Sequence, residues 1–474
     1  MRLLPLFLAL GVHASLCAEP QPNILFLLSD DQDWTGLSFA QDPEHPGSQS
    51  DFYETPNTAK LASEGMIFTD AYAPASVCSA TRFSLQTGMS TARTGWTKAA
   101  PLITKADNPK LLPPPTLKTF EGSVFSTIGE VLQTAGYATA HYGKWHINGG
   151  GPEANGYDES DGENGNAAAA PFRDPNPVDI FGMGERASAF MEKSKAAGKP
   201  FFIQMSYHAL HYPENARAAT VAKYEAKPKG TIHHSPQRAA ITEDLDDGVG
   251  KLLGELERLG LRDSTYVIYM SDNGAGGKRG RVIRGGKGSL WEGGIRSPLI
   301  VRGPGIAPGS VSRVRSTGID LFPTFCGWAG VSDLPDDIDG GDLRPVLEGI
   351  SETVKRPREE IVFHFPHYQG SSPQSVLYLG DYKIVRNYES PGVELYEIKA
   401  DIGELRDLAS SQPERAAQMH LLLTDYLTEV GAILPSPNPD YDPDKPTTQR
   451  RGPPREGKGG REGKRGKGRK TPTQ

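Results

Sequence analysis

One cysteine stands four residues before an arginine in the segment Ser-Val-Cys-Ser-Ala-Thr-Arg, residues 76–82. The residues after it, as far as Gly88, can start a helix close to the cysteine. A helix N-terminus gathers unpaired main-chain N–H groups and the positive end of the helix dipole, so it favours an anion and an activated nucleophile. Cys78 is therefore the first candidate for chemistry in this chain.

Four oxygen-bearing side chains follow two apolar runs. Asp30 and Asp31 come directly after one run, and Asp272 and Asn273 come after another much later in the chain. The carboxyl ends of strands in an open α/β sheet share one edge, so these side chains can converge there. Adjacent carboxylates repel unless a cation lies between them, and an all-oxygen set favours calcium or magnesium over zinc. Taken alone, Asp-Asp after a strand is more often a helix cap, and Asp-Asn-Gly is more often a turn.

Basic side chains fall at expected strand ends or in glycine-rich loops. Lys287 lies within Arg-Gly-Gly-Lys-Gly-Ser, whose glycines let the main chain approach a ligand closely. Lysine, as a compact charge, suits a tetrahedral oxyanion such as sulfate or phosphate. A single loop lysine or histidine is usually solvated or structural, so the convergence of several beside a metal is what would indicate function. The candidates are Arg82, Lys144, His146, His211 and Lys287.

Strands alternate with helices through the first two thirds of the chain. Such alternation predicts an α/β fold, with a large, mainly parallel or mixed central sheet flanked by helices on both faces. The expected strands are 23–29, 66–72, 138–142, 199–206 and 265–270, and the expected helices are 57–65, 127–135 and 236–259.

The pattern changes after about residue 333. Short strands are expected at 360–365, 375–379, 382–387 and 393–398, followed by one amphipathic helix at 413–430. This predicts a smaller C-terminal antiparallel sheet covered by a helix. The expected division is a signal peptide at 1–18, a catalytic α/β domain at 19–335, a C-terminal α+β subdomain at 336–435 and a disordered Pro/Gly/basic tail at 436–474.

The first 18 residues have Arg2 followed by a short apolar run, which is typical of a secretory signal peptide and too short to span a bilayer. We therefore expect export to the periplasm or the extracellular space, with no stable membrane insertion. Lipidation of Cys17 is disfavoured because Leu16 is larger than the residue such a cleavage site takes. Removal of the signal leaves Cys78 and Cys326, and the apolar surroundings of Cys326 predict a buried thiol rather than a disulfide.

The net charge of −7 is unevenly spread. Residues 450–470 hold ten Lys/Arg and two Glu, a local +8, which leaves −15 for the rest of the chain. With no apolar residue to anchor it, this segment is expected to be a solvated tail, or alternatively a tail that binds an anionic polymer. Nucleic acid is a less suitable partner for an exported enzyme.

Six ordered motifs lie within residues 22–410: Leu-Ser-Asp-Asp-Gln-Asp, Cys-Ser-Ala-Thr-Arg, Gly-Lys-Trp-His, Leu-His-Tyr-Pro, Ser-Asp-Asn-Gly and Gly-Gly-Lys-Gly-Ser-Leu-Trp-Glu-Gly-Gly-Ile-Arg. Together they resemble the motifs of the formylglycine-dependent sulfatases of the alkaline phosphatase superfamily. A C-terminal signature at 394–397 and 404–409 resembles that family too. The commonest family motif has proline two residues after the cysteine, whereas Ala80 here resembles a minority form.

The resemblance implies that Cys78 is converted to formylglycine (3-oxoalanine) by a formylglycine-generating enzyme or an anaerobic sulfatase-maturing enzyme. One hydroxyl of its hydrate would attack sulfur, and collapse of the other would release sulfate. The resemblance also implies one calcium ion, Ca2+, to polarise the sulfate oxygens. Its ligands would be Asp30, Asp31, residue 78, Asp272 and Asn273.

The same resemblance implies roles for the basic residues. Arg82 would hold the diol, and His146 would help to remove its proton. His211 would protonate the leaving alcohol, with His208 as a weaker alternative. Lys144 and Lys287 would neutralise the charge that grows on sulfate.

The resulting hypothesis is an exported sulfatase that hydrolyses sulfate monoesters of sulfated carbohydrate. The alternatives are a phosphate or phosphonate monoester hydrolase of the same superfamily and an inactive glycan-binding protein. Specificity is expected in the loops 44–54, 98–122, 148–174, 212–235 and 364–372. Candidate sugar contacts there are Arg173, Arg217, His364, His367 and Tyr368, although each is also typical of a plain surface residue.

Overall fold

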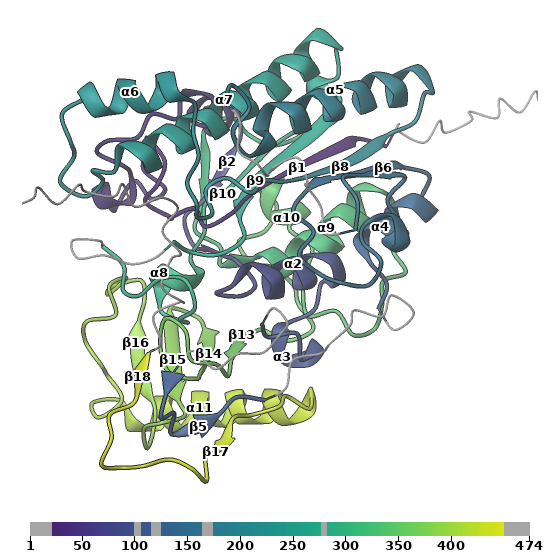
Figure 1. Cartoon of the computed structure of the whole chain (residues 1–474). Coiled ribbons are helices and arrows are strands. Elements are labelled where there is room, and N and C mark those ends of the chain that lie inside the picture. Colours follow the sequence, from purple (N-terminus) through teal and green to yellow (C-terminus); the bar gives the residue numbers. More distant parts are fainter. Residues whose placement is uncertain (1–20, 99–105, 115–124, 164–173, 276–281, 450–474) are drawn as a thin grey trace, which may run out of the picture.

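The computed structural model describes residues 21–98, 106–114, 125–163, 174–275 and 282–449. The expected signal peptide, Cys17 and Arg173 lie outside this range. No helix in the described part of the chain is long and apolar enough to cross a bilayer. Figure 1 shows a large α/β layer above a small sheet and its helix.

An eight-stranded mixed sheet forms the centre of the protein, in the order β11-β2-β10-β9-β1-β8-β6-β7. β10 runs antiparallel to both of its neighbours, and the other pairings are parallel. This confirms the predicted fold class. The strands are β1 (Asn23–Ser29), β2 (Met66–Phe68), β6 (Ala138–Gly143), β7 (Glu159–Ser160), β8 (Phe201–Ser206), β9 (Thr265–Ser271), β10 (Leu299–Arg302) and β11 (Ser310–Ser312).

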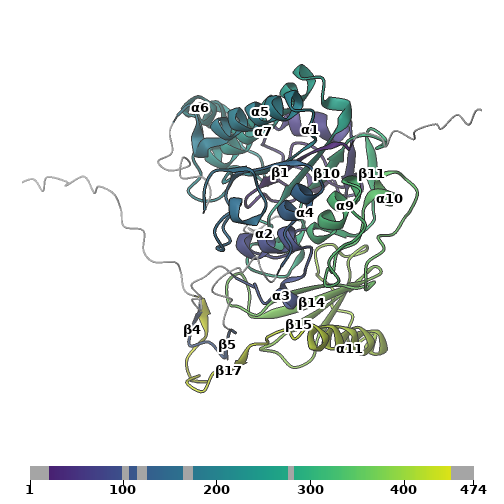
Figure 2. The same ribbon diagram turned by 90° about the vertical axis from the view of Figure 1, so that its right-hand side faces the viewer.

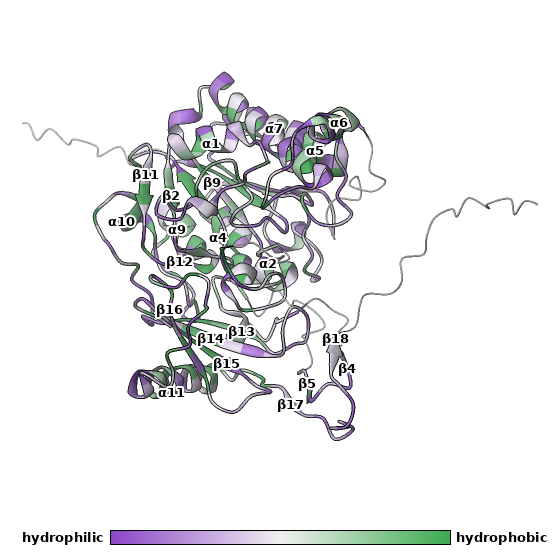
Figure 3. Ribbon diagram, turned by 90° about the vertical axis from the view of Figure 1, so that its left-hand side faces the viewer, coloured by the Kyte–Doolittle hydropathy of each residue, from purple (hydrophilic) through white to green (hydrophobic). Residues whose placement is uncertain are grey.

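Alternate side chains of β1 enter two separate cores, because successive residues of a strand point to opposite faces. Leu25 and Leu27 pack with one set of helices, and Phe26 packs with the other. Figures 1 and 2 show these helices on the two faces, and Figure 3 shows apolar residues concentrated in the strands between them. One face carries α1 (Pro56–Ser63), α5 (Ile180–Ala196) and α7 (Pro236–Arg258), and the other carries α2 (Cys78–Thr87), α4 (Ile128–Thr134), α9 (Leu321–Trp328) and α10 (Arg344–Leu347).

The C-terminal region forms the predicted antiparallel sheet with a covering helix. Leu377 and Ile384 pack on one face against Leu423 of the helix. Phe363 and Tyr378 belong to the core shared with α2 and α9, so the small sheet is joined to the large domain. Its elements are β13 (Ile361–Phe365), β14 (Gln374–Leu379), β15 (Tyr382–Asn387), β16 (Glu394–Glu397) and α11 (Pro413–Glu429).

Two local expectations were wrong, and one helix was missed. The strand expected at 66–72 is split, because β3 (Ala71–Tyr72) pairs with β12 (Ser316–Thr317) in a separate sheet. The guanidinium of Arg296 binds the main-chain oxygen of Thr69 and the carboxylate of Asp70 at the break. The expected loop at 212–235 contains α6 (Ala218–Ala226), and helix α5 was not predicted.

The first part of the expected tail is paired with the rest of the protein. β17 (Ser436–Pro437) pairs with β5 (Leu111–Leu112), and β18 (Thr448–Gln449) pairs with β4 (Ala106–Asp107). The side-chain amide of Asn108 also donates to the main-chain oxygen of Asp442, at 2.8 Å. Disorder from residue 436 is therefore wrong for residues 436–449, while 450–474 lie outside the described residues. The short helices α3 (Thr91–Thr94) and α8 (Glu292–Ile295) complete the fold.

Candidate active site

Cys78 is the first residue of α2, which is buried along its whole length. The hydroxyl of Thr81 fixes the entry of the chain, since it lies 3.1 Å from both the main-chain nitrogen and the main-chain oxygen of Ala75. Only 6% of Cys78 is exposed, and this burial raises the pKa of its thiol. The helix N-terminus is as expected, but an unmodified Cys78 is not an activated thiolate.

The four acidic and amide side chains converge because β1 and β9 are parallel neighbours that end in register, with Ser29 opposite Ser271. The side-chain nitrogen of Asn273 donates to Asp31 Oδ1 at 2.7 Å, and the main-chain nitrogen of Asp31 donates to Asp272 Oδ1 at 3.2 Å. One ligand atom from each of Asp30, Asp31 and Cys78 lies within 4.8 Å of the other two.

This cluster fits a hard cation. Asp30 Oδ1 and Asn273 Oδ1 are buried and have no hydrogen-bond partner among the described residues. Buried acceptors are nearly always satisfied, so two such oxygens beside a third carboxylate suit an ion that takes oxygen ligands. Burial, together with the charge of Asp30, raises the pKa of Asp272 to about 6, which shows the cost of three close carboxylates without a cation.

Three basic side chains surround these oxygens. Arg82 Nη2 lies 2.8 Å from Asp272 Oδ2, and Lys144 Nζ contacts Asp30 Oδ2. Burial opposes ionisation of Asp30, but the charges of Lys144, Lys287 and Arg82 outweigh it and hold the pKa of this carboxyl well below its usual range. Lys287 Nζ contacts Asp31 Oδ1 and lies 3.5 Å from Cys78 Sγ, so its ammonium group joins the nucleophile position to the acidic cluster.

Burial lowers the pKa of the histidines of the site. The main-chain oxygen of His146 accepts a hydrogen bond of 2.8 Å from Ser79, next to Cys78. Burial and the charges of Lys144 and Arg82 lower the pKa of His146 to about 3. Its Nδ1 is buried without a hydrogen-bond partner in the described part of the chain.

His211 Nδ1 lies 2.6 Å from the main-chain oxygen of Tyr212, which can only accept, so the ring hydrogen belongs on Nδ1. Burial lowers the pKa of His211, and burial also lowers that of His208, to about 4. The proposed metal ligands therefore lie in contact with one another and with Arg82, Lys144 and Lys287, and the charges of Asp30 and Lys144 act on both His146 and His211.

Three of the candidate sugar contacts, His364, His367 and Tyr368, were wrong because their side chains are buried and bonded within the protein. His364 lies 2.7 Å from the hydroxyl of Ser375, and His367 lies 2.7 Å from that of Thr97. The hydroxyl of Tyr368 donates to Glu389 at 2.6 Å. Each of the three residues is at most 2% exposed. Arg217 is paired with Asp244 and Asp247 on α7. Cys326 is a buried free thiol, as expected, and no disulfide joins it to Cys78.

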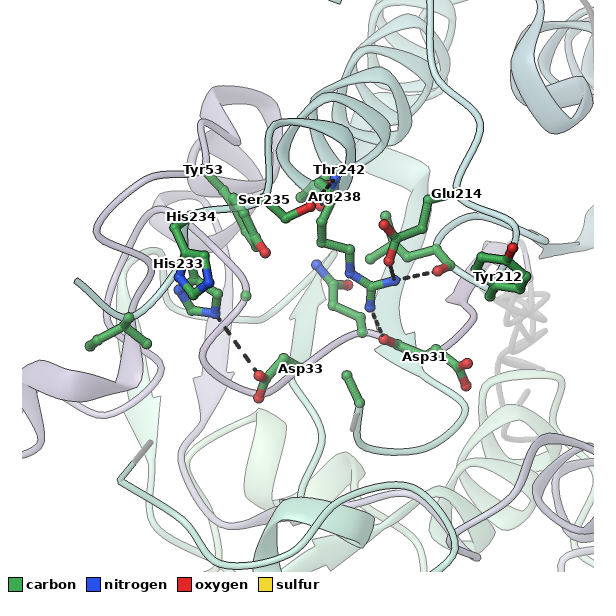
Figure 4. A pocket seen from close by; sticks show the side chains of 15 residues that line it. Asp31, Asp33, Tyr53, Tyr212, Glu214, His233, His234, Ser235, Arg238 and Thr242 are labelled. Carbon is green, nitrogen blue, oxygen red and sulfur yellow. Dashed lines mark hydrogen bonds and ion pairs between the residues drawn. The ribbon is translucent and has the colours of Figure 1, made fainter. Parts of the chain in front are cut away.

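Sequence reasoning missed Arg238, in the first turn of α7. Its guanidinium donates to the main-chain oxygens of Asp31 and Leu210 and lies 3.2 Å from Glu214 Oε1 (Figure 4). The helix pattern of α7 gave no reason to single it out, because its partners are main-chain atoms of two distant loops.

Comparison with known proteins matches this geometry to one family. The sulfatase family model matches residues 22–331, and a model described as N-sulphoglucosamine sulphohydrolase, C-terminal, matches residues 286–430. The chain is 30% identical to human arylsulfatase A over 416 residues, which cover 77% of this chain and 74% of that protein. It is 32% identical to N-acetylgalactosamine-6-sulfatase from Rattus norvegicus over 425 residues, which cover 80% and 74% of the two chains.

The crystal structure of Ps i-CgsB in complex with k-i-k-neocarrahexaose has the same fold. It has a TM-score of 0.70 and 22% identity, and the match covers 86% of this chain and 93% of that one. The chain therefore belongs to the sulfatase family and is a sulfuric ester hydrolase.

Proposed function

We propose that this protein is an exported sulfatase that hydrolyses sulfate esters of sulfated carbohydrate, with residue 78 in its formylglycine form and one calcium ion. The observation that carries the proposal is the position of Cys78 at a buried helix N-terminus, 3.5 Å from Lys287 Nζ and within 4.8 Å of carboxylate oxygens of Asp30 and Asp31. Export is proposed from the N-terminal apolar segment.

Calcium would be held by Asp30, Asp31, Asp272, Asn273 and residue 78, and it would polarise the sulfate oxygens while formylglycine supplies the attacking hydroxyl. Arg82 fixes the position of Asp272 through two hydrogen bonds, of 2.8 and 3.1 Å. Lys144 and Lys287 place positive charge where the anionic ester binds, which stabilises the charge that develops as the ester bond breaks.

His146 and His211 are the proposed proton-transfer residues. His146 would help to remove the proton of the remaining hydroxyl when sulfate is released. His211 gives a proton to the leaving alcohol, since an anionic ester beside it raises its pKa and so opposes the effect of burial.

A sugar substrate is supported by what similar proteins bind or act on. One relative is an N-acetylgalactosamine-6-sulfatase, and the fold neighbour Ps i-CgsB was solved with k-i-k-neocarrahexaose. The cluster of basic groups around one small site suits a single sulfate group presented by such a molecule.

Mass spectrometry of the peptide containing residue 78, from protein matured in its own source, tests the proposal. We expect the mass of the aldehyde, and a loss of aryl sulfate hydrolysis of at least about 10³-fold in Cys78→Ala. Cys326→Ala is the matched control, since it also removes a buried thiol. This variant should keep its activity because Cys326 lies on α9 and does not belong to the acidic and basic cluster of the site.

Three results would contradict the proposal. Full activity in Cys78→Ala would exclude the mechanism. A strong preference for aryl phosphate over the matched aryl sulfate would indicate a phosphate ester hydrolase instead. An unmodified thiol without turnover would favour a glycan-binding role.

A further inference from the structure

A cavity of about 310 Å³ lies directly beside the candidate active site (Figure 4). Its lining comes from the loop after β1, the loop after β8, residues 232–235 with the first turns of α7, and the single residues Tyr53 and Ala275. Its volume is at the lower end of the range for small-ligand sites, about 300–1,000 Å³. It is therefore large enough for one sugar ring rather than for a long chain.

The cavity borders the candidate active site at Asp31 and at the two residues on either side of His211. Asp31 lines it and also contacts Lys287, while Leu210 and Tyr212, the neighbours of His211, line it from the other loop. A proton donor must lie within hydrogen-bond reach of the leaving oxygen, so the group attached to that oxygen lies next to His211. The cavity next to His211 is therefore placed to take this group.

The walls of the cavity offer aromatic rings, which can pack against the apolar face of a sugar ring, and carboxylates, which can accept hydrogen bonds from its hydroxyl groups. Tyr212 is 55% exposed at the rim, and an aromatic ring can pack against the C–H face of a pyranose. Tyr53 lies deeper, with its ring centroid 4.5 Å from that of His233. Carboxylates of Asp33 and Glu214, which accept hydrogen bonds from hydroxyl groups, also line the cavity.

His233 lacks a hydrogen-bond partner that this cavity could supply. Its side chain is 2% exposed, and neither ring nitrogen is hydrogen-bonded to a described residue. The nearest carboxylate oxygens, of Asp33 and Asp51, lie 3.9 and 3.8 Å away, which is beyond a normal hydrogen bond. A buried polar ring of this kind is normally satisfied, so a hydroxyl group within the cavity is a suitable partner.

The charges of the cavity disfavour a second anion. Arg238, the arginine among its described lining residues, is already engaged by the main-chain oxygens of Asp31 and Leu210 and by the Glu214 carboxylate. Asp33 and Glu214 would repel a further sulfate or carboxylate on the bound ring.

We propose that this cavity binds the pyranose ring that carries the scissile sulfate, and that it selects a ring without a second anionic group. Tyr212 packs on the ring, Glu214 and His233 bond its hydroxyl groups, and Asp33 and Glu214 exclude a further sulfate or carboxylate. This inference rests on the proposed function for the reaction, and it adds a rule for which sugars can enter the cavity.

The test compares hydrolysis of monosulfated and disulfated forms of the same sugars, galactose and N-acetylgalactosamine, with 4-nitrophenyl sulfate as a reporter of the reaction. For the wild-type protein we expect kcat/KM to be at least tenfold higher for the best monosulfated sugar than for its disulfated form. Tyr212→Ala should raise KM for the monosulfated sugar about tenfold. Glu214→Gln should reduce the mono-to-disulfated preference at least fivefold, because it removes a negative charge and frees Arg238.

Glu225→Gln is the matched control, since Glu225 is exposed on α6 and does not line the cavity, and it should leave the preference unchanged. A wild-type preference for disulfated sugars, or hydrolysis of the aryl ester without any of the monosulfated sugars, would overturn the inference. So would an unchanged KM in Tyr212→Ala together with an unchanged preference in Glu214→Gln. Absence of aryl sulfate hydrolysis by matured wild-type protein would instead count against the proposed function.

Discussion

The ammonium nitrogen of Lys287 lies 3.5 Å from the Sγ of Cys78 and also contacts the carboxylate of Asp31. Lys287 is carried by a glycine-rich loop in which Gly288 has a φ of +81°, a conformation that favours glycine. A Cβ at Gly288 would also lie 2.5 Å from the side chain of Gln369. The loop can therefore bring a charge to residue 78 while lying close against the neighbouring segment.

Replacing Lys287 by alanine should lower kcat/KM for 4-nitrophenyl sulfate by about 10²–10³-fold, which corresponds to about 3–4 kcal/mol of transition-state stabilisation. The reason is that its charge faces the position where negative charge grows. Steady-state kinetics on matured protein measures the loss. Lys60→Ala, at a 54% exposed lysine of α1, is the control and should stay within twofold of wild type. A loss of less than about fivefold in Lys287→Ala would contradict this role.

Calcium binding should depend on Asn273, whose Oδ1 is buried without a hydrogen-bond partner in the described part of the protein. We expect calcium to raise the melting temperature of chelator-treated wild-type protein, because it binds the folded state. Asn273→Ala should need at least about tenfold more calcium for the same rise. Calorimetric titration gives the affinity independently of activity. Equal calcium affinities of variant and wild type would exclude Asn273 as a ligand.

Much of the site could be predicted from the sequence because its residues follow recognisable elements. Asp30 and Asp272 come after buried strands, and Cys78 begins a helix. His364 and His367 looked like loop residues in sequence, but β13 and the segment after it carry them into the interior. Arg238 bonds main-chain oxygens of distant loops, and the pairing of residues 436–449 joins segments more than 300 residues apart. Local patterns contain no signal for contacts of this kind.

A buried cluster between the two sheets should make stability depend on pH. Lys383 Nζ lies 2.6 Å from Glu404 and 3.1 Å from Glu292. Burial raises the pKa of Glu404 from 4.5 to about 7, which the charge of Glu292 reinforces and that of Lys383 opposes. Since the folded pKa is the higher one, this contribution to stability is full below pH 4.5 and is lost as the pH rises to about 7.

Glu404→Gln removes this titration. The difference in melting temperature, variant minus wild type, should therefore rise between pH 5 and pH 7 and then level off. Circular dichroism at each pH gives the two melting temperatures. Glu348→Gln, at an exposed glutamate, serves as the control and should give a constant difference across this range. Parallel curves for Glu404→Gln and wild type would show that Glu404 does not titrate there.

Arg238 should act as a positioning residue, because it joins the main chain of Asp31 to that of Leu210, next to His211. Asp31 has a φ of +61°, which is unfavourable for a residue other than glycine, so the turn depends on such contacts. Lysine keeps the charge but cannot bridge two carbonyl oxygens as a planar guanidinium does. A displacement of about 1 Å can cost about 10²-fold in rate. We therefore expect Arg238→Lys to lower kcat for 4-nitrophenyl sulfate by about 10–100-fold and to change KM by less than about threefold.

Arg217→Lys is the matched control for this prediction. Arg217 also pairs with carboxylates of α7, but it contacts neither Asp31 nor Leu210 through a hydrogen bond of its side chain. Arg217→Lys disturbs two carboxylate pairs, whereas Arg238→Lys disturbs one carboxylate pair and two bonds to main-chain oxygens. A general loss of stability would therefore appear in both variants. A fall in kcat confined to Arg238→Lys would support positioning of the His211 loop, since only that substitution loosens the link between the acidic cluster and the proton donor. An equal fall in the two variants, or an unchanged kcat in Arg238→Lys, would show that the bridge is structural.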